Sequence, residues 1–231
     1  MRSAVILAGG MGRRIGMEKA FIEFSGKSLI ERTLKTLRPV VDELVVVARD
    51  PDQSRRLEAI LDDASITCDL IPGQGPVAGI QAGLLKASGK YAFACGCDLP
   101  FLNARVVEML FEKAEGYHAA VPRKDGYAER LHAVYNRAKM EEASRCALDE
   151  GERRISAPLS RLNVNYVDSE ALRSLDRELL TFFNLNTAED LRMAQAISIG
   201  GPSIAGRRHT PPGRRARAVP GTIGGPIERP L

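Results

Sequence analysis

Residues 7–19 read LAGGMGRRIGMEK and directly follow the apolar run Ser3-Ala4-Val5-Ile6. A buried strand that runs into a glycine-rich loop with basic residues is typical of a site that holds phosphate. The dinucleotide fingerprint G-x-G-x-x-G is excluded, because Ile15 stands where its third glycine is required. The P-loop G-x-x-x-x-G-K-[ST] is excluded too, since Phe21 takes the place of its first glycine ahead of Gly26-Lys27-Ser28. A third kind of phosphate loop is therefore expected.

The remaining pattern is L-A-G-G-x-G-x-R-x-G-x-x-K, and its residue types suit an anionic ligand. Gly9 and Gly10 have no Cβ, so their backbone amides can turn toward phosphate oxygens. Arg14 offers a planar fork of donors, and Lys19 adds a compact positive charge. The loop therefore predicts a ligand that carries phosphate groups.

Apolar runs rich in β-branched residues alternate with stretches of helical spacing along most of the chain. The predicted strands are Ala4–Ala8, Leu44–Ala48, Ile66–Ile71, Tyr91–Cys95, Ala119–Pro122 and Leu131–Tyr135. The predicted helices are Ser28–Leu37, Pro51–Leu61, Val77–Ala87, Ala104–Ala114, Ala138–Asp149 and Ala188–Ala196. This alternation predicts an α/β fold with three layers, a Rossmann-like, mostly parallel sheet with helices on both faces. Ligands of such sheets bind at the carboxyl ends of the strands, where the glycine loop and Cys97-Asp98-Leu99-Pro100 fall.

The composition is that of an ordinary globular protein, with 231 residues, 44% hydrophobic and 27% charged. No apolar run reaches the roughly 20 residues that span a bilayer, and the N-terminus lacks a signal-peptide pattern. We therefore expect a cytoplasmic protein that has no membrane partner.

The end of the chain differs from the rest in composition. Residues 198–231 are rich in Gly, Pro and Arg and show no apolar period, so we predict a disordered basic tail behind one folded domain of residues 1–197. The tail is either a solvated extension or an arm that binds a polyanion or a partner. It carries the positive charge of the chain, so no specific nucleic-acid partner is expected for the folded part.

Several sequence blocks resemble one enzyme family. Residues Leu7-Ala8-Gly9-Gly10, Arg14, Gly16 and Lys19 are similar to the signature of nucleotidyltransferases with the nucleotide-diphosphosugar-transferase fold. Within that fold the chain most resembles the molybdenum cofactor guanylyltransferases, which join GMP from GTP to molybdopterin. The resemblance covers residues 4 to about 196, and its further blocks are Gly75-Pro76-Val77-Ala78-Gly79, Cys97-Asp98-Leu99-Pro100-Phe101, Gly151-Glu152-Arg153-Arg154 and Phe183-Asn184-Leu185-Asn186-Thr187-Ala188-Glu189-Asp190-Leu191.

The resemblance implies a Mg²⁺-dependent nucleotidyl transfer with GTP as substrate. Asp98 corresponds to the family's magnesium aspartate, although an aspartate in such a turn can also bond its own backbone. Arg14 and Lys19 would neutralise the β- and γ-phosphates, so the implied catalytic residues are Arg14, Lys19 and Asp98. The residues implied in nucleotide binding are Leu7, Ala8, Gly9, Gly10, Lys19, Asp69, Gly75 and Gly79.

The resemblance places the acceptor on the other half of the site. Arg153 and Arg154 are candidates for holding the acceptor's phosphate, or else form a solvated pair in a loop. Asn184 and Asn186 match asparagines of the family's acceptor site, or else mark a helix entry in which Asn186 or Thr187 caps the helix that follows; Asn186 could do both. Because a phosphate monoester has a second pKa of about 6 and is already a dianion at neutral pH, no strong general base is needed.

One departure from the family lies near the expected base. The family commonly has an asparagine after its second strand, whereas this chain reads Val47-Ala48-Arg49-Asp50. The alternatives to a guanylyltransferase are a cytidylyltransferase or other nucleotidyltransferase with a phosphorylated acceptor, and a non-catalytic carrier of nucleotide or cofactor. The guanylyltransferase reading implies GTP and molybdopterin as ligands, with other cofactor-biosynthesis proteins and molybdoenzymes as partners.

Overall fold

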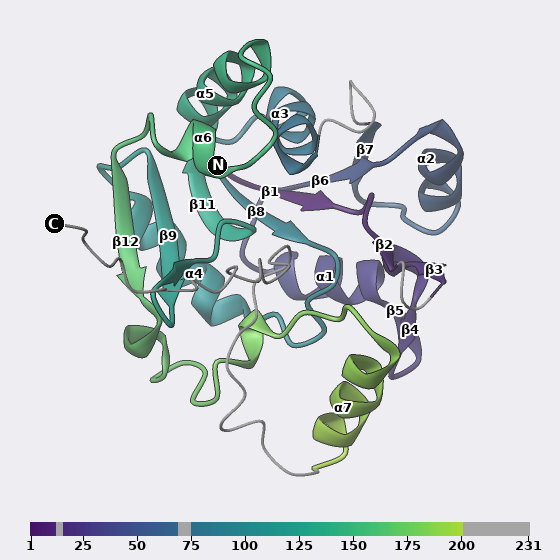
Figure 1. Ribbon diagram of the computed structural model, residues 1–231. Helices are drawn as coiled ribbons and strands as arrows, with labels where there is room; N and C mark the ends of the chain where they lie inside the picture. Colours follow the sequence, from purple (N-terminus) through teal and green to yellow (C-terminus); the bar gives the residue numbers. More distant parts are fainter. Residues whose placement is uncertain (13–15, 69–74, 201–231) are drawn as a thin grey trace, which may run out of the picture.

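The computed structural model describes residues 1–12, 16–68 and 75–200 and has an eight-stranded sheet at its centre (Figure 1). Arg14 and Asp69 lie outside the described residues. The strands of the sheet are β1 (Arg2–Leu7), β6 (Glu43–Ala48), β7 (Ser65–Cys68), β8 (Tyr91–Gly96), β9 (Ala119–Lys124), β10 (Tyr127–Ala128), β11 (His132–Asn136) and β12 (Val164–Asp168). Two small hairpins lie beside it, formed by β2 (Met11–Gly12) with β3 (Met17–Glu18) and by β4 (Glu23–Phe24) with β5 (Lys27–Ser28).

The order of the strands is β10-β9-β11-β8-β1-β6-β7, with β12 also paired to β9. The four strands β7, β6, β1 and β8 are parallel, as predicted, and β12 is parallel to β9. Strand β11 lies antiparallel between β8 and β9, so the sheet is mixed. The prediction of a mostly parallel α/β sheet is therefore confirmed, and β1, which ends in the glycine loop, lies among the four neighbouring parallel strands.

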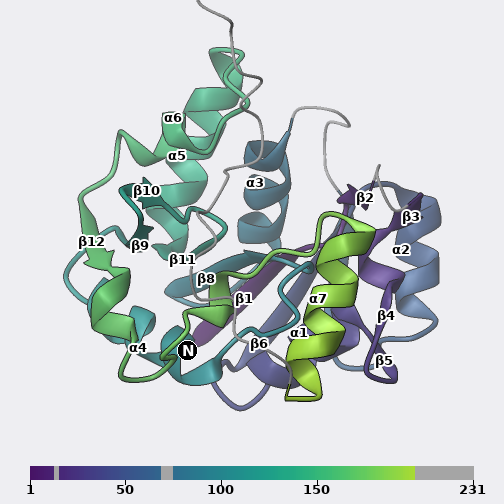
Figure 2. The same cartoon turned by 60° about the horizontal axis from the view of Figure 1, so that its bottom comes forward.

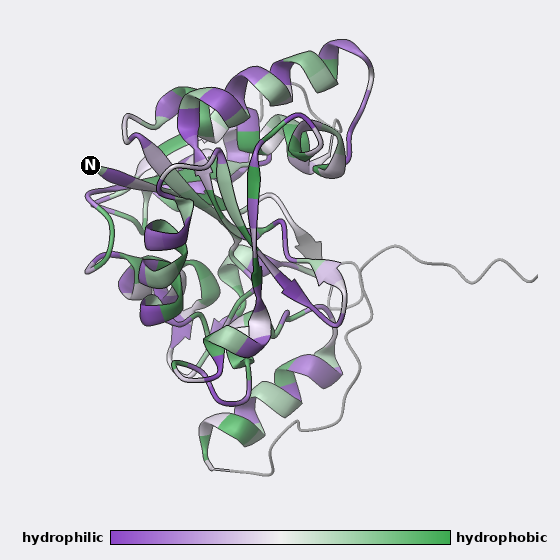
Figure 3. Ribbon diagram, turned by 90° about the vertical axis from the view of Figure 1, so that its left-hand side faces the viewer, coloured by the Kyte–Doolittle hydropathy of each residue, from purple (hydrophilic) through white to green (hydrophobic). Residues whose placement is uncertain are grey.

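Helices cover both faces of the sheet (Figure 1 and Figure 2). One apolar cluster joins α1, α2 and α4 to one face, through β1 residues such as Ile6, and a second joins α3, α5 and α6 to the other, through Val5. Successive residues of a strand point to opposite faces, which is why one short apolar run serves both clusters. Figure 3 shows both hydrophilic (purple) and hydrophobic (green) residues on the helices, as expected for amphipathic helices that pack on a buried sheet. The helices are α1 (Leu29–Leu37), α2 (Pro51–Glu58), α3 (Pro76–Lys86), α4 (Ala104–Ala114), α5 (Arg137–Asp149), α6 (Ser156–Leu159) and α7 (Ala188–Ser198).

Capping residues explain where several helices begin. Ser28 and Glu31 form a reciprocal capping box at α1, and Thr187 forms one with Asp190 at α7. Asp50 caps α2 ahead of Pro51, in the first helical position that suits proline. These are local signals, and the predicted helix starts agree with the structure within one residue.

Several elements differ from the sequence prediction. The predicted helix Pro51–Leu61 ends at Glu58 as α2. The predicted strand Ile66–Ile71 ends at Cys68 as β7, and its last residues lie outside the described part. Strand β12 was not predicted, because Asn165 breaks its apolar run and its pairing depends on β9. Helix α7 continues to Ser198, one residue beyond the predicted domain boundary, because its last turn is still helical there.

The C-terminal part of the described chain returns to the carboxyl ends of the central strands. A segment of short turns, residues 169–187, connects β12 to α7, and Figure 2 shows α7 beside β4 and β5. An apolar cluster of Phe24, Leu29, Leu185 and Ala194 fastens α7 there. None of the described helices is long and apolar enough to cross a membrane.

Candidate active site at the carboxyl ends of β1, β6 and β8

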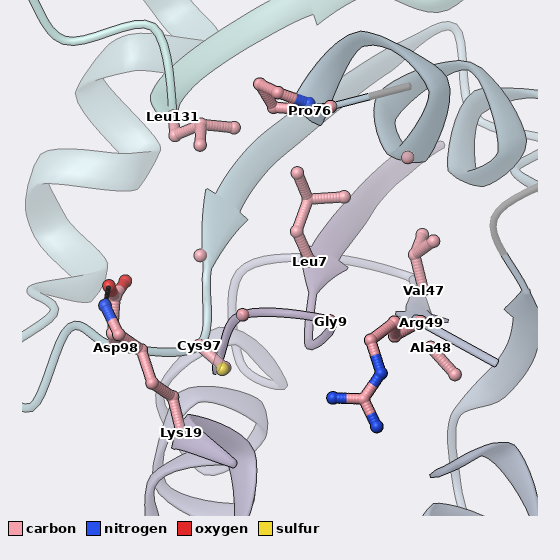
Figure 4. Close-up of a pocket in the computed structure, with 14 residues that line it drawn as sticks. Leu7, Gly9, Lys19, Val47, Ala48, Arg49, Pro76, Cys97, Asp98 and Leu131 are labelled. Atoms are coloured by element: carbon pink, nitrogen blue, oxygen red, sulfur yellow. Dashed lines mark hydrogen bonds and ion pairs between the residues drawn. The ribbon is translucent and has the colours of Figure 1, made fainter. Parts of the chain in front are cut away.

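The carboxyl ends of β1, β6 and β8 open into a cavity of about 590 Å³ (Figure 4). That volume lies within the roughly 300–1,000 Å³ of small-molecule sites. Seven predicted site residues line it, namely Leu7, Gly9, Gly10, Lys19, Gly75, Gly79 and Asp98. The segment expected near the base contributes Val47, Ala48 and Arg49 to the lining, and the other lining residues are Pro76, Gly96, Cys97 and Leu131.

A three-residue polar cluster borders the cavity. Lys19 Nζ donates to Asp98 Oδ2 at 2.5 Å and to Asn186 Oδ1 at 2.6 Å. The side chains of Lys19 and Asp98 are 12% and 18% exposed, so water screens this pair less than it screens a surface pair. Figure 4 shows Lys19 reaching up to Asp98 at one end of the cavity. The cluster therefore brings the ammonium group of Lys19 into contact with one oxygen of Asp98 and one oxygen of Asn186.

Backbone contacts bring the three residues together. Lys19 N donates to Gly10 O at 3.2 Å, which closes the glycine loop behind β1. Leu185 N donates to Asp98 O at 2.9 Å, which holds the C-terminal segment against the end of β8. Asn186 therefore lies beside Lys19 and Asp98, so one candidate acceptor contact is next to the two candidate catalytic residues.

The oxygen donors of the cluster suit a hard divalent cation. Among the described hydrogen bonds, Asp98 uses Oδ2 and its Oδ1 forms none. A Cβ on Gly96 would lie 2.5 Å from that Oδ1, so the glycine leaves room for it. The described residues contain no group of three or more His, Cys, Asp or Glu side chains that could enclose a metal. The donor set therefore fits Mg²⁺, which uses one or two carboxylates together with substrate phosphates.

The glycine loop packs tightly against the end of β6. A Cβ on Gly9 would lie 3.1 Å from Arg49 Cβ, and one on Gly10 would lie 3.6 Å from Lys19 Cδ. Ala8 is fully buried in the core below the loop and does not line the cavity. Its backbone N–H donates to Val47 O at 2.9 Å, so Ala8 anchors the loop.

The start of α3 forms the opposite wall. Gly75 has φ 75° and ψ −169°, a conformation that a residue with a Cβ rarely adopts. Gly79 lies against Leu7, whose Cδ2 would be 3.2 Å from a Cβ at that position. These glycines let α3 approach β1 closely, so the positive end of the helix borders the cavity.

The acceptor candidates are less closely gathered. Arg153 and Arg154 are exposed and do not line the cavity. Arg153 nevertheless lies at its border, because a Cβ on Gly75 would be 3.0 Å from Arg153 O. Asn184 Nδ2 donates to Phe182 O at 3.0 Å and stays in its own segment. Arg153 thus lies next to a lining residue of the cavity, whereas the hydrogen bond of Asn184 lies within its own segment.

Sequence reasoning missed a polar network behind the glycine loop. Glu18 accepts from Arg49 Nη2 at 2.9 Å, from Arg56 Nη1 at 3.1 Å and from Gln53 Nε2 at 3.3 Å. The pKa of Arg49 is raised by its hydrogen bond to Asp50 and, second, by its hydrogen bond to Glu18. The position of Glu18 next to Lys19 in the sequence could have pointed to Glu18. The partners of Gln53 could be identified only in the tertiary structure.

Two ionisable groups near the strand ends are held neutral by burial. Cys97 lines the cavity, and burial raises the pKa of its thiol well above the usual range, so the thiol stays protonated. Burial lowers the pKa of His132 to about 3, and its imidazole is neutral at physiological pH. Neither group therefore offers an activated nucleophile or a base to the cavity.

Comparisons with known proteins agree with this geometry. The family model of the MobA-like NTP transferase domain matches residues 4–164. A protein from Methanosarcina mazei named "Probable molybdenum cofactor guanylyltransferase" is 42% identical over 82% of this chain and 88% of its own length. The "Molybdenum cofactor guanylyltransferase" of Desulfosudis oleivorans is 36% identical over 84% of this chain and 94% of its own length.

Solved structures give the same result. Molybdopterin-guanine dinucleotide biosynthesis protein A from Archaeoglobus fulgidus superposes with a TM-score of 0.77 and 38% identity, over 87% of this chain and 100% of that one. A 2-C-methyl-D-erythritol 4-phosphate cytidylyltransferase from Thermus thermophilus, 20% identical over 85% of this chain and 98% of that one, shares the fold with a TM-score of 0.60. The chain therefore belongs to the MobA-like NTP transferase family and, within it, to the molybdenum cofactor guanylyltransferases.

Proposed function

We propose that this protein transfers GMP from GTP to the phosphate of molybdopterin and releases pyrophosphate, with Mg²⁺ held at Asp98. The carrying observation is the contact of Lys19 Nζ with both Asp98 Oδ2 and Asn186 Oδ1 at the edge of a cavity enclosed by the glycine loop and α3. The names of the relatives in Methanosarcina mazei and Desulfosudis oleivorans support guanine as the base and the molybdenum cofactor as the acceptor.

The reaction requires positioning and charge rather than a strong base. An oxygen of the acceptor phosphate forms a bond to the α-phosphorus of GTP, and the bond from that phosphorus to the bridging oxygen of pyrophosphate breaks. Pyrophosphate leaves with the electron pair of the broken bond. The acceptor is a dianion near pH 7, so the neutral, buried His132 is not needed as a base. Holding the two phosphates in line supplies most of the rate enhancement.

Lys19 stabilises the charge that develops on the leaving pyrophosphate. Its ammonium is held by two oxygens, so it is already oriented before the substrate binds. Arg14, outside the described residues, belongs to the same loop and would add a second positive charge. Asp69 also lies outside the described residues and remains a candidate contact of the nucleotide.

When bound, Mg²⁺ would supply positive charge that neutralises the substrate phosphates. Asp98 would hold it, because its Oδ1 forms no hydrogen bond among the described residues and Gly96 leaves space around that oxygen. Asn186 contributes a neutral oxygen to the same point. The nucleotide would extend from this point along Gly9, Gly10 and the start of α3.

The acceptor would approach past Arg153, which borders Gly75 at the rim of the cavity. Arg154 and Asn184 complete the set of acceptor contacts that we propose. The product is a dinucleotide form of a cofactor, so cofactor-biosynthesis proteins and molybdoenzymes are the protein partners that this function implies.

The deciding experiment incubates the protein with molybdopterin, Mg²⁺ and each NTP in turn, and measures released pyrophosphate. We expect the largest kcat/KM with GTP. A clear preference for CTP would make the protein a cytidylyltransferase, an alternative that Val47-Ala48-Arg49-Asp50 leaves open because this segment lacks the asparagine that the family commonly has near the base. Nucleotide binding without pyrophosphate release in any combination would make it a carrier.

A matched pair of variants tests the metal site. Asp98→Asn keeps the shape of the side chain but removes the charge that a hard cation requires, and turnover should fall by about 10²–10³-fold. Asp149→Asn makes the same change at a side chain that is 71% exposed on α5 and should leave turnover unchanged. Near-normal turnover of Asp98→Asn at saturating substrates would contradict the assignment of Mg²⁺ to Asp98.

A further inference from the structure

Gln53 is a buried polar residue that the proposed chemistry does not use. It lies in the first turn of α2, is 1% exposed, and its backbone N–H donates to the capping Asp50 at 2.8 Å. Leu57, one helical turn later, belongs to the apolar core on the same side of α2. A position of this kind ordinarily carries an apolar residue, because a buried amide without partners destabilises the fold.

The amide of Gln53 joins three separate segments. Its Oε1 accepts from the backbone N–H of Arg49 at 2.7 Å. Its Nε2 donates to Ala8 O at 3.1 Å and to Glu18 Oε2 at 3.3 Å. A backbone N–H can only donate and a carbonyl can only accept, so these partners also determine which way the amide points.

Each of the three segments forms part of the cavity. Ala8 immediately precedes Gly9 of the glycine loop, Arg49 lines the wall at the end of β6, and Glu18 precedes Lys19. The two walls nearly touch, since a Cβ on Gly9 would lie 3.1 Å from Arg49 Cβ. Gln53 itself is not among the residues that line the cavity.

We propose that Gln53 is a positioning residue that holds the glycine loop, the end of β6 and the backbone before Lys19 at the spacing that nucleotide binding requires. The inference rests on the proposed function in that the cavity must bind a nucleotide. It assigns Gln53 to the nucleotide half of the site and not to the acceptor half, because Ala8, Arg49 and Glu18 all lie on the glycine-loop side.

The side chain works through its hydrogen bonds rather than its volume. Methionine at this position has nearly the same length, is apolar and favours helix, so it keeps the packing against the core. It cannot bond Arg49 N, Ala8 O or Glu18, so the two walls lose their common support. A displacement of about 1 Å at a binding site can cost about 10²-fold, which sets the scale of the expected effect.

The test compares Gln53→Met with Arg55→Met, a matched control on the same helix whose side chain is 73% exposed. For Gln53→Met we expect the Kd of a fluorescent GTP analogue with Mg²⁺ to rise by about 10- to 100-fold. The KM for molybdopterin should stay the same, and the amide proton of Arg49 should lose its protection against exchange. Arg55→Met should match the original protein in all three measurements.

A second variant gives a reading that altered stability would not imitate. Glutamate in place of Gln53 can still accept from Arg49 N, but its ionised form cannot donate to Ala8 O and repels Glu18. Burial beside Glu18 raises the pKa of the new carboxyl, and its protonated form regains a donor. Nucleotide affinity of Gln53→Glu relative to the original protein should therefore recover as the pH falls from 8 to 6.

Two results would overturn the proposal: unchanged nucleotide affinity in Gln53→Met, or an equal rise of KM for nucleotide and for molybdopterin. If Gln53→Met does not fold, Gln53→Glu decides, and the lack of any recovery at low pH counts against the proposal. Nucleotide affinity is measured for both GTP and CTP. Exchange of the Arg49 amide proton is measured without any nucleotide. A preference for CTP would therefore contradict the proposed function while the role of Gln53 could still be confirmed.

Discussion

Replacing His132 with glutamine should remove a large part of the acid sensitivity of the fold. His132 is 2% exposed, and its ring lies between Phe93 and Phe182, with centroid distances of 5.3 and 4.8 Å. Its Nε2 is 3.2 Å from Thr181 Oγ1, and its Nδ1 has no hydrogen-bond partner among the described residues. Nothing in this apolar setting compensates a positive charge, so burial lowers the pKa from 6.5 to about 3.

The pKa of His132 determines the sign and the size of the change in the free energy of unfolding with pH. Below pH 6.5 the unfolded chain takes up a proton at His132, whereas the native state does not until about pH 3. The unfolded state therefore binds more protons in this window, and the free energy of unfolding falls as the pH falls through it. Each pH unit below 6.5 costs about 1.4 kcal/mol, so the loss between pH 8 and pH 5 is about 2 kcal/mol.

Urea unfolding at pH 8 and pH 5 measures this loss. His132→Gln cannot titrate, so its decrease in the free energy of unfolding should be smaller than that of the original protein by about 2 kcal/mol. Other titrating groups contribute equally to both proteins and cancel in the comparison. His132→Leu provides a second non-titrating side chain in case glutamine disturbs the packing. An equal decrease in all three proteins would refute the reasoning, because it would mean that His132 does not stay neutral in the native state.

The remaining predictions concern the Lys19 cluster and the tail. Lys19→Ala should lower kcat more than it raises the KM for GTP if its ammonium acts on the departing pyrophosphate, as we propose; a change confined to KM in steady-state kinetics would contradict this. Asn186→Ala removes one of the two oxygens that orient Lys19 and should lower kcat by about 10-fold, since a hydrogen bond to a charged group contributes about 1.5–3 kcal/mol. Unaltered turnover would show that Asp98 alone is sufficient. A chain that ends after Gly200 should keep the melting temperature and turnover of the full chain, because α7 ends at Ser198, and a loss of either would give residues 201–231 a role in the fold or the reaction.

The sequence by itself determined the features that depend on neighbouring residues. Spacing of apolar residues predicted β1, β6, β8 and the helices between them, because burial against a sheet imposes a periodicity that can be read along the chain. Capping side chains located helix starts within a residue. The glycine loop after β1 identified the region of the site. Glycines there let backbone N–H groups turn toward an anion, and basic side chains add positive charge.

Only the tertiary structure decided which residues meet. Lys19 joins Asp98 across 79 positions and Asn186 across 167, and Gln53 reaches back 45 positions to Ala8. Likewise, β11 runs antiparallel to β8, and β12 becomes a strand because β9 offers it an unpaired edge. Such contacts depend on strand order and on the packing of helices against both faces. The spacing of neighbouring residues does not predict strand order or helix packing. The free energy that selects them comes from burying many residues that are distant in the sequence.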